Sequence, residues 1–330
     1  MSPARHSVQS VLGGLRAAAE STRLRVLSLC AEADLTVSDL TQVLGQSQPR
    51  VSRHLKLMCE AGLLERNQEG SWAFFRVART GPGAAIATAL NQLLPNDDEA
   101  LARDHARLES IRQARAEAAS AYFRANAAEW HRIRTLHVDD REVERALGGA
   151  VPMHGVDDLL DVGTGTGRML ELFGPRIARG LGIDTSREML ALARANLDRV
   201  GLRHCAVRHG DMYHLPLADR SFDAVIVHQV LHYAEHPERV IAEAARVVRP
   251  GGRLAVIDFA PHALEELRLD HAHRRLGFPE EEIAGWLAAV GLAPEPARNL
   301  VGQPLTVSIW IAKRPAETVA LRRVGAGGRP

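Results

Sequence analysis

A strand-like run with an acid near its end, followed by closely spaced glycines, constrains the fold of this chain more than any other feature. The run covers residues 159–162 and contains Asp161, and Gly163, Gly165 and Gly167 follow it directly before a helical pattern. Further β-branched runs then alternate with helical periodicity. These runs lie at residues 180–183, 206–209, 224–227 and 254–258. Such alternation predicts βαβ units on a parallel sheet, so we expect the second half of the chain to be a Rossmann-like α/β domain.

Acids lie at the ends of successive predicted strands in this half. Asp161 precedes the first glycine, Asp184 ends the second strand and Asp211 follows the third. Asp184 could accept both hydroxyls of a ribose, and Asp211 could accept from an adenine amino group, with Met212 against the ring. Singly, Asp184 could instead cap a helix and Asp211 could shape a turn. Together they predict one nucleoside-binding edge, and the glycine spacing is not that of a dinucleotide site.

These motifs closely resemble those of class I methyltransferases, and within them the ubiquinone and menaquinone biosynthesis enzymes. The matching stretches are residues 161–167, Asp184, and residues 210–216, 221–225 and 245–254. The resemblance implies binding of S-adenosylmethionine (SAM), or of S-adenosylhomocysteine (SAH) as an effector, and no metal is expected. The residues that we assign to this ligand are Asp161, Gly163, Thr164, Gly165, Gly167, Asp184, Thr185, Met189, Asp211, Met212 and His228.

Candidates for a catalytic base follow the fourth predicted strand. They are His228, His232 and Tyr233. Methyl transfer needs a base only when the acceptor must lose a proton. The alternative, that these are packing residues at a strand–helix junction, is at least as well supported. The Asn/Asp-Pro-Pro-Tyr signature of amino-group methylation is absent from the sequence.

The N-terminal part contains a helical pattern with an apolar and a polar face. Val51, Leu55 and Met58 share one face at helical spacing. The other face carries Gln48, Arg50, Ser52, Arg53, His54 and Lys56. Such an acid-free face suits phosphate contacts and base reading in the major groove. A short helix over residues 36–44 precedes it and a strand-like hairpin over residues 63–77 follows, which predicts an α+β winged helix-turn-helix.

This part closely resembles the ArsR/SmtB winged-helix regulators over about residues 8–80. The matching stretches are residues 22–27, 35–40, 48–55 and 61–64. The family is dimeric, so the resemblance implies a homodimer on double-stranded operator DNA. The DNA contacts that we expect are Ser47, Gln48, Arg50, Ser52, Arg53, His54, Lys56 and Arg66.

The chain departs from the metal-sensing members of that family. Thr36 and Ser38 stand where arsenic sensors carry cysteines, and hydroxyls are poor ligands for a soft metalloid. His105 and Glu109 further along are expected to be an ordinary exposed helical pair. Metal sensing is therefore not expected, and the controlling signal should come from elsewhere in the chain.

Composition adds weaker constraints. The net charge of +1 requires any basic surface to be local. Scattered cysteines, no signal-peptide pattern and no apolar run near the ~20 residues of a membrane span favour a cytoplasmic protein. The expected divisions are a winged-helix domain at 1–82, a helical linker or dimerisation region at 83–150, a methyltransferase domain at 151–313 and a flexible tail at 314–330.

Parts of the sequence leave alternatives open. Leu101, Leu108 and Ile111 are spaced for a coiled-coil-like seam, which could extend a dimer interface or dock the methyltransferase domain. The His- and Arg-rich residues 262–278 could cover an acceptor pocket or ligate a metal, but a solvated or interdomain role is favoured.

These observations support two hypotheses for function better than a third, a methyltransferase that acts on DNA, because no base-methylation signature appears in the sequence. One is a transcriptional regulator whose methyltransferase domain senses SAM or SAH, transfers a methyl group, or does both. The other is a small-molecule methyltransferase whose winged helix binds a partner or regulates its own gene. The sequence names neither the methyl acceptor nor the target genes.

Overall fold

The computed structural model describes residues 7–69, 72–78, 80–95, 97–126, 140–151 and 154–316. The chain divides into two compact units. The first comprises Met1–Phe123 and Pro261–Leu276, and the second comprises Arg124–Ala260 and Gly277–Pro330. The domain boundaries predicted above stay predictions. The sequence favoured a solvated or interdomain role for residues 262–278, and residues 261–276 group with the N-terminal unit.

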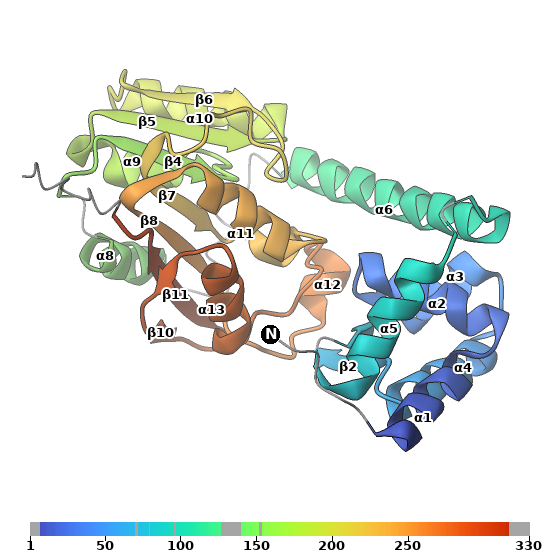
Figure 1. Ribbon diagram of the computed structural model, residues 1–330. Coiled ribbons are helices and arrows are strands. Elements are labelled where there is room, and N and C mark those ends of the chain that lie inside the picture. Colours follow the sequence, from blue (N-terminus) through green and yellow to red (C-terminus); the bar gives the residue numbers. More distant parts are fainter. Residues whose placement is uncertain are drawn as a thin grey trace, which may run out of the picture. The chain divides into compact units, whose positions relative to one another are not determined.

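Helices surround a small antiparallel sheet in the first unit (Figure 1). Its elements are α1 (Val8–Ala18), α2 (Ser21–Glu32), β1 (Leu35–Thr36), α3 (Val37–Leu44), α4 (Gln48–Glu60), β2 (Leu64–Glu69), β3 (Trp72–Val77), α5 (Gly81–Leu93), most of α6 (Glu99–Asn126) and α12 (Glu266–Asp270). The strand order is β1-β3-β2, and both pairs are antiparallel. The order α3, α4 and hairpin confirms the predicted winged helix-turn-helix.

Local sequence explains the helix-turn-helix. Thr36 and Asp39 form a capping box at the start of α3, in which each side chain accepts a hydrogen bond from the backbone N–H of the other residue. Gly45 ends this helix in the left-handed conformation, with φ of 64°. Ser47 is the residue before α4, and Pro49 lies in the first turn, where its missing N–H costs nothing.

Helix α6 packs onto the N-terminal helices of the same chain. Leu108 is part of the core of the first unit, and Ile111 packs against that core. Arg25 donates two hydrogen bonds, of 2.5 and 2.7 Å, to the buried carboxylate of Asp104. The apolar positions of α6 therefore lie inside the winged-helix unit, an arrangement that the sequence pattern did not distinguish.

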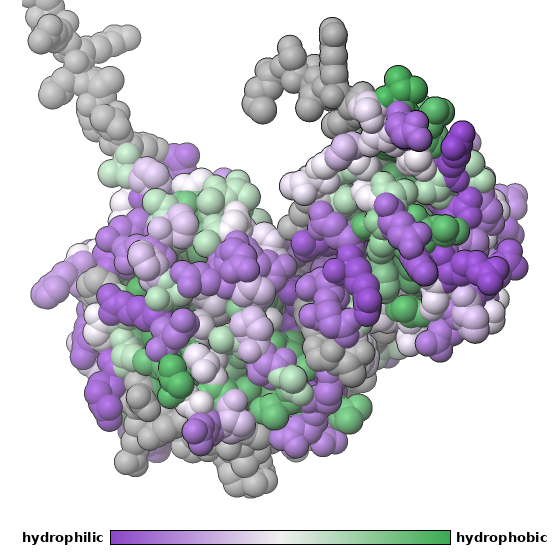
Figure 2. All heavy atoms as spheres, turned by 90° about the horizontal axis from the view of Figure 1, so that it is seen from below, coloured by the Kyte–Doolittle hydropathy of each residue, from purple (hydrophilic) through white to green (hydrophobic). Residues whose placement is uncertain are grey.

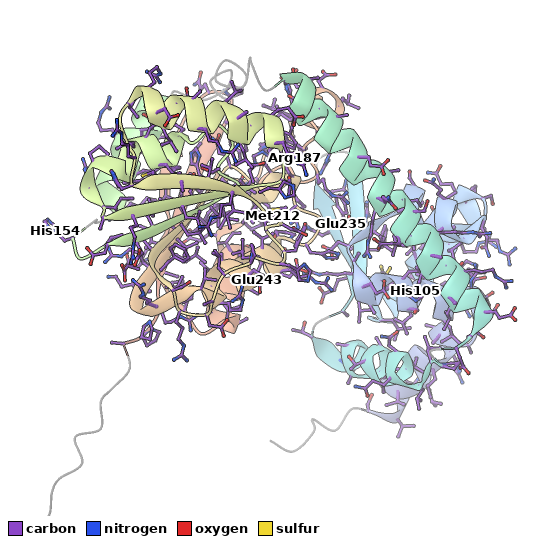
Figure 3. The ribbon with its side chains drawn as sticks, turned by 90° about the horizontal axis from the view of Figure 1, so that it is seen from above. His105, His154, Arg187, Met212, Glu235 and Glu243 are labelled. Atoms are coloured by element: carbon purple, nitrogen blue, oxygen red, sulfur yellow. The ribbon has the colours of Figure 1, made fainter. Side chains whose placement is uncertain are left out.

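His105 on α6 is also engaged with α2 (Figure 3). Its Nε2 lies 3.0 Å from Ser28 Oγ, and its Nδ1 lies 2.9 Å from a carboxylate oxygen of Glu32. The prediction that His105 and Glu109 form an ordinary exposed pair is therefore wrong. A sequence pattern along one helix cannot show which side chains of another helix lie opposite it.

A mostly parallel sheet with helices on both faces forms the second unit (Figure 1). Its elements are α8 (Asp140–Ala150), β4 (Asp158–Val162), α9 (Arg168–Phe173), η2 (Gly174–Arg176), β5 (Arg179–Asp184), α10 (Arg187–Arg199), β6 (Cys205–His209), β7 (Phe222–His228), η3 (Leu231–Tyr233), α11 (Pro237–Arg246), β8 (Val248–Phe259), α13 (Glu280–Ala289), β9 (Ala293–Pro294), β10 (Arg298–Val301) and β11 (Thr306–Lys313). The strand order is β10-β11-β8-β7-β4-β5-β6, with β9 on β11.

Strand direction fixes where a ligand site can form. Strands β4 to β8 pair in parallel, whereas β11 is antiparallel to β8, β9 and β10. The predicted Rossmann-like fold is therefore confirmed. The carboxyl ends of all five parallel strands share one edge, which is where α/β sheets bind their ligands.

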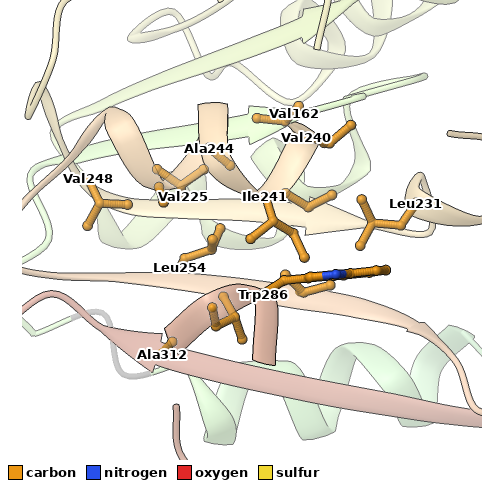
Figure 4. Packing of buried hydrophobic residues seen from close by; sticks show 14 of the residues in the cluster. Val162, Val225, Leu231, Val240, Ile241, Ala244, Val248, Leu254, Trp286 and Ala312 are labelled. Carbon is orange, nitrogen blue, oxygen red and sulfur yellow. The ribbon is translucent and has the colours of Figure 1, made fainter. Parts of the chain in front are cut away.

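Successive side chains along the strands point to opposite faces of the sheet, and those on one face form the core of this unit (Figure 4). Val162, Val225 and Leu254 point to one face, where Ile241 of α11 and Trp286 of α13 cover them. Helices α9 and α10 contact β5, and α8 contacts α9, on the side of the sheet that these residues do not occupy. Both faces are covered, which explains why the strands are apolar runs and not alternating polar and apolar residues.

Hydrophobic side chains form separate patches among hydrophilic ones on the face seen in Figure 2. Within the described ranges, no helix combines the length and the apolar character that a membrane crossing requires.

Candidate functional site

The glycine-rich loop after β4 forms the centre of the candidate site. Gly163, Gly165 and Gly167 all have positive φ, at 71°, 52° and 85°, a region that other residues rarely adopt. The N–H groups of Gly163 and Thr164 both donate to the carbonyl of Ile183, at 2.8 and 3.0 Å. The loop is thereby tied to the end of β5, with its backbone at the carboxyl edge of the sheet.

Asp161 lies beneath this loop. Its carboxylate is 1% exposed, and one oxygen accepts a 2.6 Å hydrogen bond from the hydroxyl of Thr164. The pair fixes the first turn of the loop. A direct contact of either residue with a ligand stays a prediction.

Asp184 at the end of β5 is also hydrogen-bonded to the glycine loop. One carboxylate oxygen accepts from the N–H of Gly165 and the other from the N–H of Ser186, both at 2.8 Å. Burial raises the pKa of Asp184, and the hydrogen bonds from Ser186, Gly165 and Thr185 oppose that rise. The cap of α10 is Ser186, whose hydroxyl accepts from Met189 N–H at 3.2 Å. Three backbone donors use three of the roughly four acceptor positions of this carboxylate, which leaves one for a ribose hydroxyl.

Asp211 and Met212 follow β6. One oxygen of Asp211 accepts from the N–H of Tyr213 at 2.9 Å, so this side chain shapes the turn, as the alternative interpretation expected. Its side chain is also 54% exposed, and its other oxygen lies 3.9 Å from Nδ1 of His214. Met212 is partly buried against the core of the sheet (Figure 3). Adenine contacts by these two residues stay predictions.

Arg246 holds the loop that contains Asp211 and Met212. Its guanidinium donates to the carbonyls of Leu215 and Leu217 at 3.0 and 2.8 Å, and to Asp219 at 2.6 Å. It also makes two 2.9 Å bonds to Glu243, which in turn accepts from the N–H of Leu215 at 3.0 Å. The sequence resemblance included Arg246 without a role. Its bonds to carbonyls distant along the chain could not be predicted from local pattern.

The end of β7 carries a residue that the sequence did not single out. Gln229 has φ of 53°, rare for a residue with a side chain, and its N–H donates to the carbonyl of Ile257 at 2.7 Å. Its amide nitrogen Nε2 is buried and has no hydrogen-bond partner among the described residues. A buried donor without a partner is costly, which points to a contact supplied by a ligand. Gln229 is therefore an additional candidate for the site.

The candidate catalytic residues divide into different environments. His232 is 2% exposed, and its Nδ1 lies 2.7 Å from a carboxylate oxygen of Asp258, which is fully buried. The N–H of His232 donates to the other oxygen of Asp258 at 3.2 Å. The ring of Tyr233 lies 4.0 Å from that of His232, centroid to centroid, and His228 is buried at the end of β7. Asp258, which sequence reasoning missed, thus orients His232.

Helix α8 is linked to the helix that follows the glycine loop. Arg168, directly after Gly167, makes two 2.6 Å hydrogen bonds to Glu144 of α8 and one of 2.8 Å to Glu171. These hydrogen bonds raise the pKa of the Arg168 guanidinium, the bonds to Glu144 most of all. The start of α9 is therefore held against α8.

The predicted DNA-reading face lies on α4 and β2. The exposed residues are Ser47, Gln48, Arg50, Ser52, Arg53, Lys56 and, on β2, Arg66. His54 is different, because its side chain is only 11% exposed and its Nδ1 lies 3.8 Å from Glu20. Burial lowers the pKa of His54, although the charge of Glu20 opposes this. The expectation that His54 shares the exposed face is wrong, since i, i+3 spacing from Val51 places it toward the core.

Two family models match separate parts of the chain. Residues 160–256 match the model of a methyltransferase domain, and residues 20–66 match that of the arsR family of bacterial regulatory proteins. A demethylmenaquinone methyltransferase from Thermobifida fusca is 30% identical over 192 residues, which cover 57% of this chain and 75% of that protein. A phosphatidylethanolamine N-methyltransferase from Cereibacter sphaeroides is 37% identical over 36% of this chain, and an arsenite methyltransferase from Aquipseudomonas alcaligenes is 36% identical over 34%. The chain spans 62% and 36% of the lengths of those two proteins.

Some solved structures align with part of this chain. A SAM-dependent methyltransferase from Methanosarcina mazei aligns over 49% of this chain and 93% of its own, at 21% identity and a TM-score of 0.41. Geranyl diphosphate C-methyltransferase from Streptomyces coelicolor aligns over 48% and 71%, at 14% identity and a TM-score of 0.42. The chain therefore belongs to the methyltransferase family that includes the demethylmenaquinone enzymes, and it carries an arsR-family helix-turn-helix ahead of its methyltransferase domain.

Proposed function

We propose that this protein is a DNA-binding regulator whose methyltransferase domain binds SAM or SAH, and that the bound ligand changes its affinity for DNA. The observation that carries the proposal is the hydrogen bond from the N–H of Gly165 to Asp184, which builds the candidate ligand site at the edge of the sheet. The same chain exposes the polar face of α4 to solvent. Family membership favours the same ligands.

The residues of the site fit a nucleoside with an attached amino acid. The glycines of the loop carry no side chains, so their backbone can approach a ligand at the edge of the sheet, and Asp184 keeps an acceptor position for a ribose hydroxyl. Met212 offers an apolar surface to an adenine ring. The buried amide of Gln229 offers a donor for the amino-acid end of the ligand. Thr185 and Asp211, whose side chain is 54% exposed, complete the proposed contacts.

The winged-helix unit supports operator binding as a dimer. Six exposed polar residues of α4 and its N-cap, with Arg66 on β2, form a surface suited to phosphates and base edges. Helices α1 and α5 contact each other and expose apolar side chains. These are Val8, Leu12, Leu15 and Leu93, which are 76%, 43%, 43% and 79% exposed. Such exposed apolar side chains favour contact with a second copy of this unit in a dimer.

The signal that acts on this unit is proposed to be the methyltransferase ligand. Thr36 and Ser38 stand where arsenic sensors have thiolates, so the helix-turn-helix lacks that family's soft-metal ligands. A ligand can change DNA affinity only if it binds the two conformations of the protein differently. The proposal therefore requires different SAH affinities with and without DNA.

The test is a titration of the DNA upstream of this protein's own gene, without ligand and with saturating SAM or SAH. We expect a severalfold change in DNA affinity with one of the ligands, lost in Asp184→Ala. Asp198→Ala is the matched control, because Asp198 is exposed on α10. Unchanged DNA affinity in a protein shown by calorimetry to bind both ligands would contradict the regulatory role.

A second candidate function, methyl transfer, is favoured by the pair His232 and Asp258. Bound SAM would supply the methyl group. With Nδ1–H donated to Asp258, the other ring nitrogen of His232 carries the lone pair that can accept a proton from the acceptor. Asp258 would stabilise the imidazolium that results. The pair therefore suits acceptors that lose a proton on methylation, such as hydroxyl groups.

This candidate is tested with methyl-labelled SAM and cell extract. Wild type should label a metabolite. Asp258→Asn should slow the transfer by roughly 10²–10⁴-fold while SAH affinity stays unchanged. Equal labelling by both proteins would remove the pair from the mechanism.

A further inference from the structure

Residues 261–276, here called the crossing segment, leave the methyltransferase fold between β8 and α13 and fold with the winged-helix unit. The two ends of the segment lie together. The N–H of His262 donates to the carbonyl of Leu276 at 3.0 Å, and the N–H of Phe278 donates to the carbonyl of Phe259 at 2.9 Å. The segment is therefore an excursion that starts and ends at one point of the sheet.

Arg268 of the crossing segment contacts the wing. Its guanidinium carbon lies 5.0 Å from the ring centroid of Trp72 and 5.7 Å from that of Phe74, both on β3. Within the segment, Arg268 lies 3.4 Å from both oxygens of Glu265 and donates to the carbonyl of Arg274 at 3.3 Å. Its side chain is 3% exposed. A cation over aromatic rings is held more firmly when it is shielded from water, as here.

A further contact joins the crossing segment to α6. The hydroxyl of Tyr122 lies 2.7 Å from Nδ1 of His271, and the two rings meet edge to face. Burial raises the pKa of the Tyr122 hydroxyl, and the charge of Asp270 adds to this. Of the solvated or interdomain role favoured for this part of the sequence, the solvated alternative does not describe Arg268 or His273, whose side chains are buried.

The base of the crossing segment is also linked to the glycine loop. Val230 packs against Gly163, and His232, two residues later, is bonded to Asp258. Asp258 lies three residues before the segment begins. Two contacts, with the chain between them, therefore connect the loop to the point where the chain enters the segment.

We propose that the crossing segment transmits ligand occupancy at the glycine loop to the wing, through the contact of Arg268 with Trp72 and Phe74. The proposal rests on the proposed function and adds the element that couples its two activities. If ligand bound at the glycine loop moves the end of β8, Arg268 will move relative to Trp72 and Phe74 of β3. A change in the position of the wing will then change its contacts with DNA. Coupling requires such an element with two arrangements that both sites can bias.

The test uses the full-length protein labelled with 5-fluorotryptophan. The ¹⁹F resonance of Trp72 is assigned with Trp72→Phe, and that of Trp310, buried in the sheet, is the reference. We expect saturating SAH to shift the Trp72 resonance in wild type. The shift should be lost in Arg268→Gln, whose SAH affinity by calorimetry should match that of wild type. Leu269→Ala, at a position that is 79% exposed in the same segment, should respond like wild type.

The outcomes separate the proposal from the function on which it rests. SAH binding that leaves Trp72 unmoved, or a full shift in Arg268→Gln, overturns the role of the segment. A Trp72 shift that depends on Arg268 without any change in DNA affinity supports the link but overturns regulation. Absence of binding of both SAM and SAH overturns both.

Discussion

A Cβ atom on Gly163 would overlap the γ-methyl groups of Val230, so the glycine loop and the end of β7 are in contact through a position that only glycine can fill. The same residue has φ of 71°. Backbone strain and overpacking would therefore act together in any substitution.

Gly163→Ala should weaken SAH binding at least about tenfold, because left-handed strain costs about 1–2 kcal/mol and overpacking about 1–3 kcal/mol. Calorimetry measures the affinity. Adding Val230→Ala removes the overlap but not the strain, so the double variant should recover part of the loss. If Gly163→Ala bound SAH like wild type, the loop would not be the ligand cradle.

Arg246→Lys should lower SAH affinity while leaving the fold intact. Lysine keeps the charge but cannot bind Glu243, Leu215 and Leu217 at once, so the loop with Asp211 and Met212 would loosen. We expect a loss of roughly tenfold. Arg239→Lys, on the exposed side of α11, is the control and should change nothing.

Asp158 at the amino end of β4 should make stability depend on pH. It accepts from Arg179 at 2.6 and 2.8 Å and lies 2.8 Å from Arg249, and the bonds from Arg179 chiefly lower the pKa of Asp158. A lowered carboxyl pKa gives stability that is present above the unfolded value of about 4 and is lost as the pH falls through the folded value.

Asp158→Asn should therefore lower the melting temperature at pH 7 by an amount equivalent to about 1–2 kcal/mol, and less at acid pH. Thermal denaturation between neutral and acid pH measures this. The exposed neighbour Asp157 provides the control Asp157→Asn. An equal loss at every pH would show that the ion pairs are not its source.

Arg53→Ala on α4 should weaken DNA binding and reduce the slope of log affinity against log salt by about 1, as expected for one lost phosphate contact. Anisotropy titrations at several salt concentrations measure both. Arg194→Ala removes the same charge from the exposed side of α10. A similar loss with Arg194→Ala would indicate a general charge effect.

Features that depend on neighbouring residues could be predicted from the sequence. The glycine loop, the strand ends with Asp161 and Asp184, and the two faces of α4 follow from local spacing and backbone preference. The winged helix and the parallel sheet were confirmed because periodicity and turns specify them together.

Features that depend on distant partners could not. Asp258 meets His232 only when β8 lies beside β7, and Arg246 finds its carbonyls only in the folded loop. His54 lies at the border between the faces of α4, where one helical step decides between burial and exposure. The burial of the Gln229 side-chain amide depends on a left-handed backbone conformation that the neighbouring sequence does not predict.

The two ends of the crossing segment lie together, and this suggests how such a two-domain protein can arise. Because the chain leaves and rejoins the sheet at one point, the length of this loop can change without disturbing any strand pairing. An ancestral enzyme joined to a regulator would then need only a longer loop, and no redesigned core, to gain a route between them. Shortening it to a tight turn should return two independently working halves.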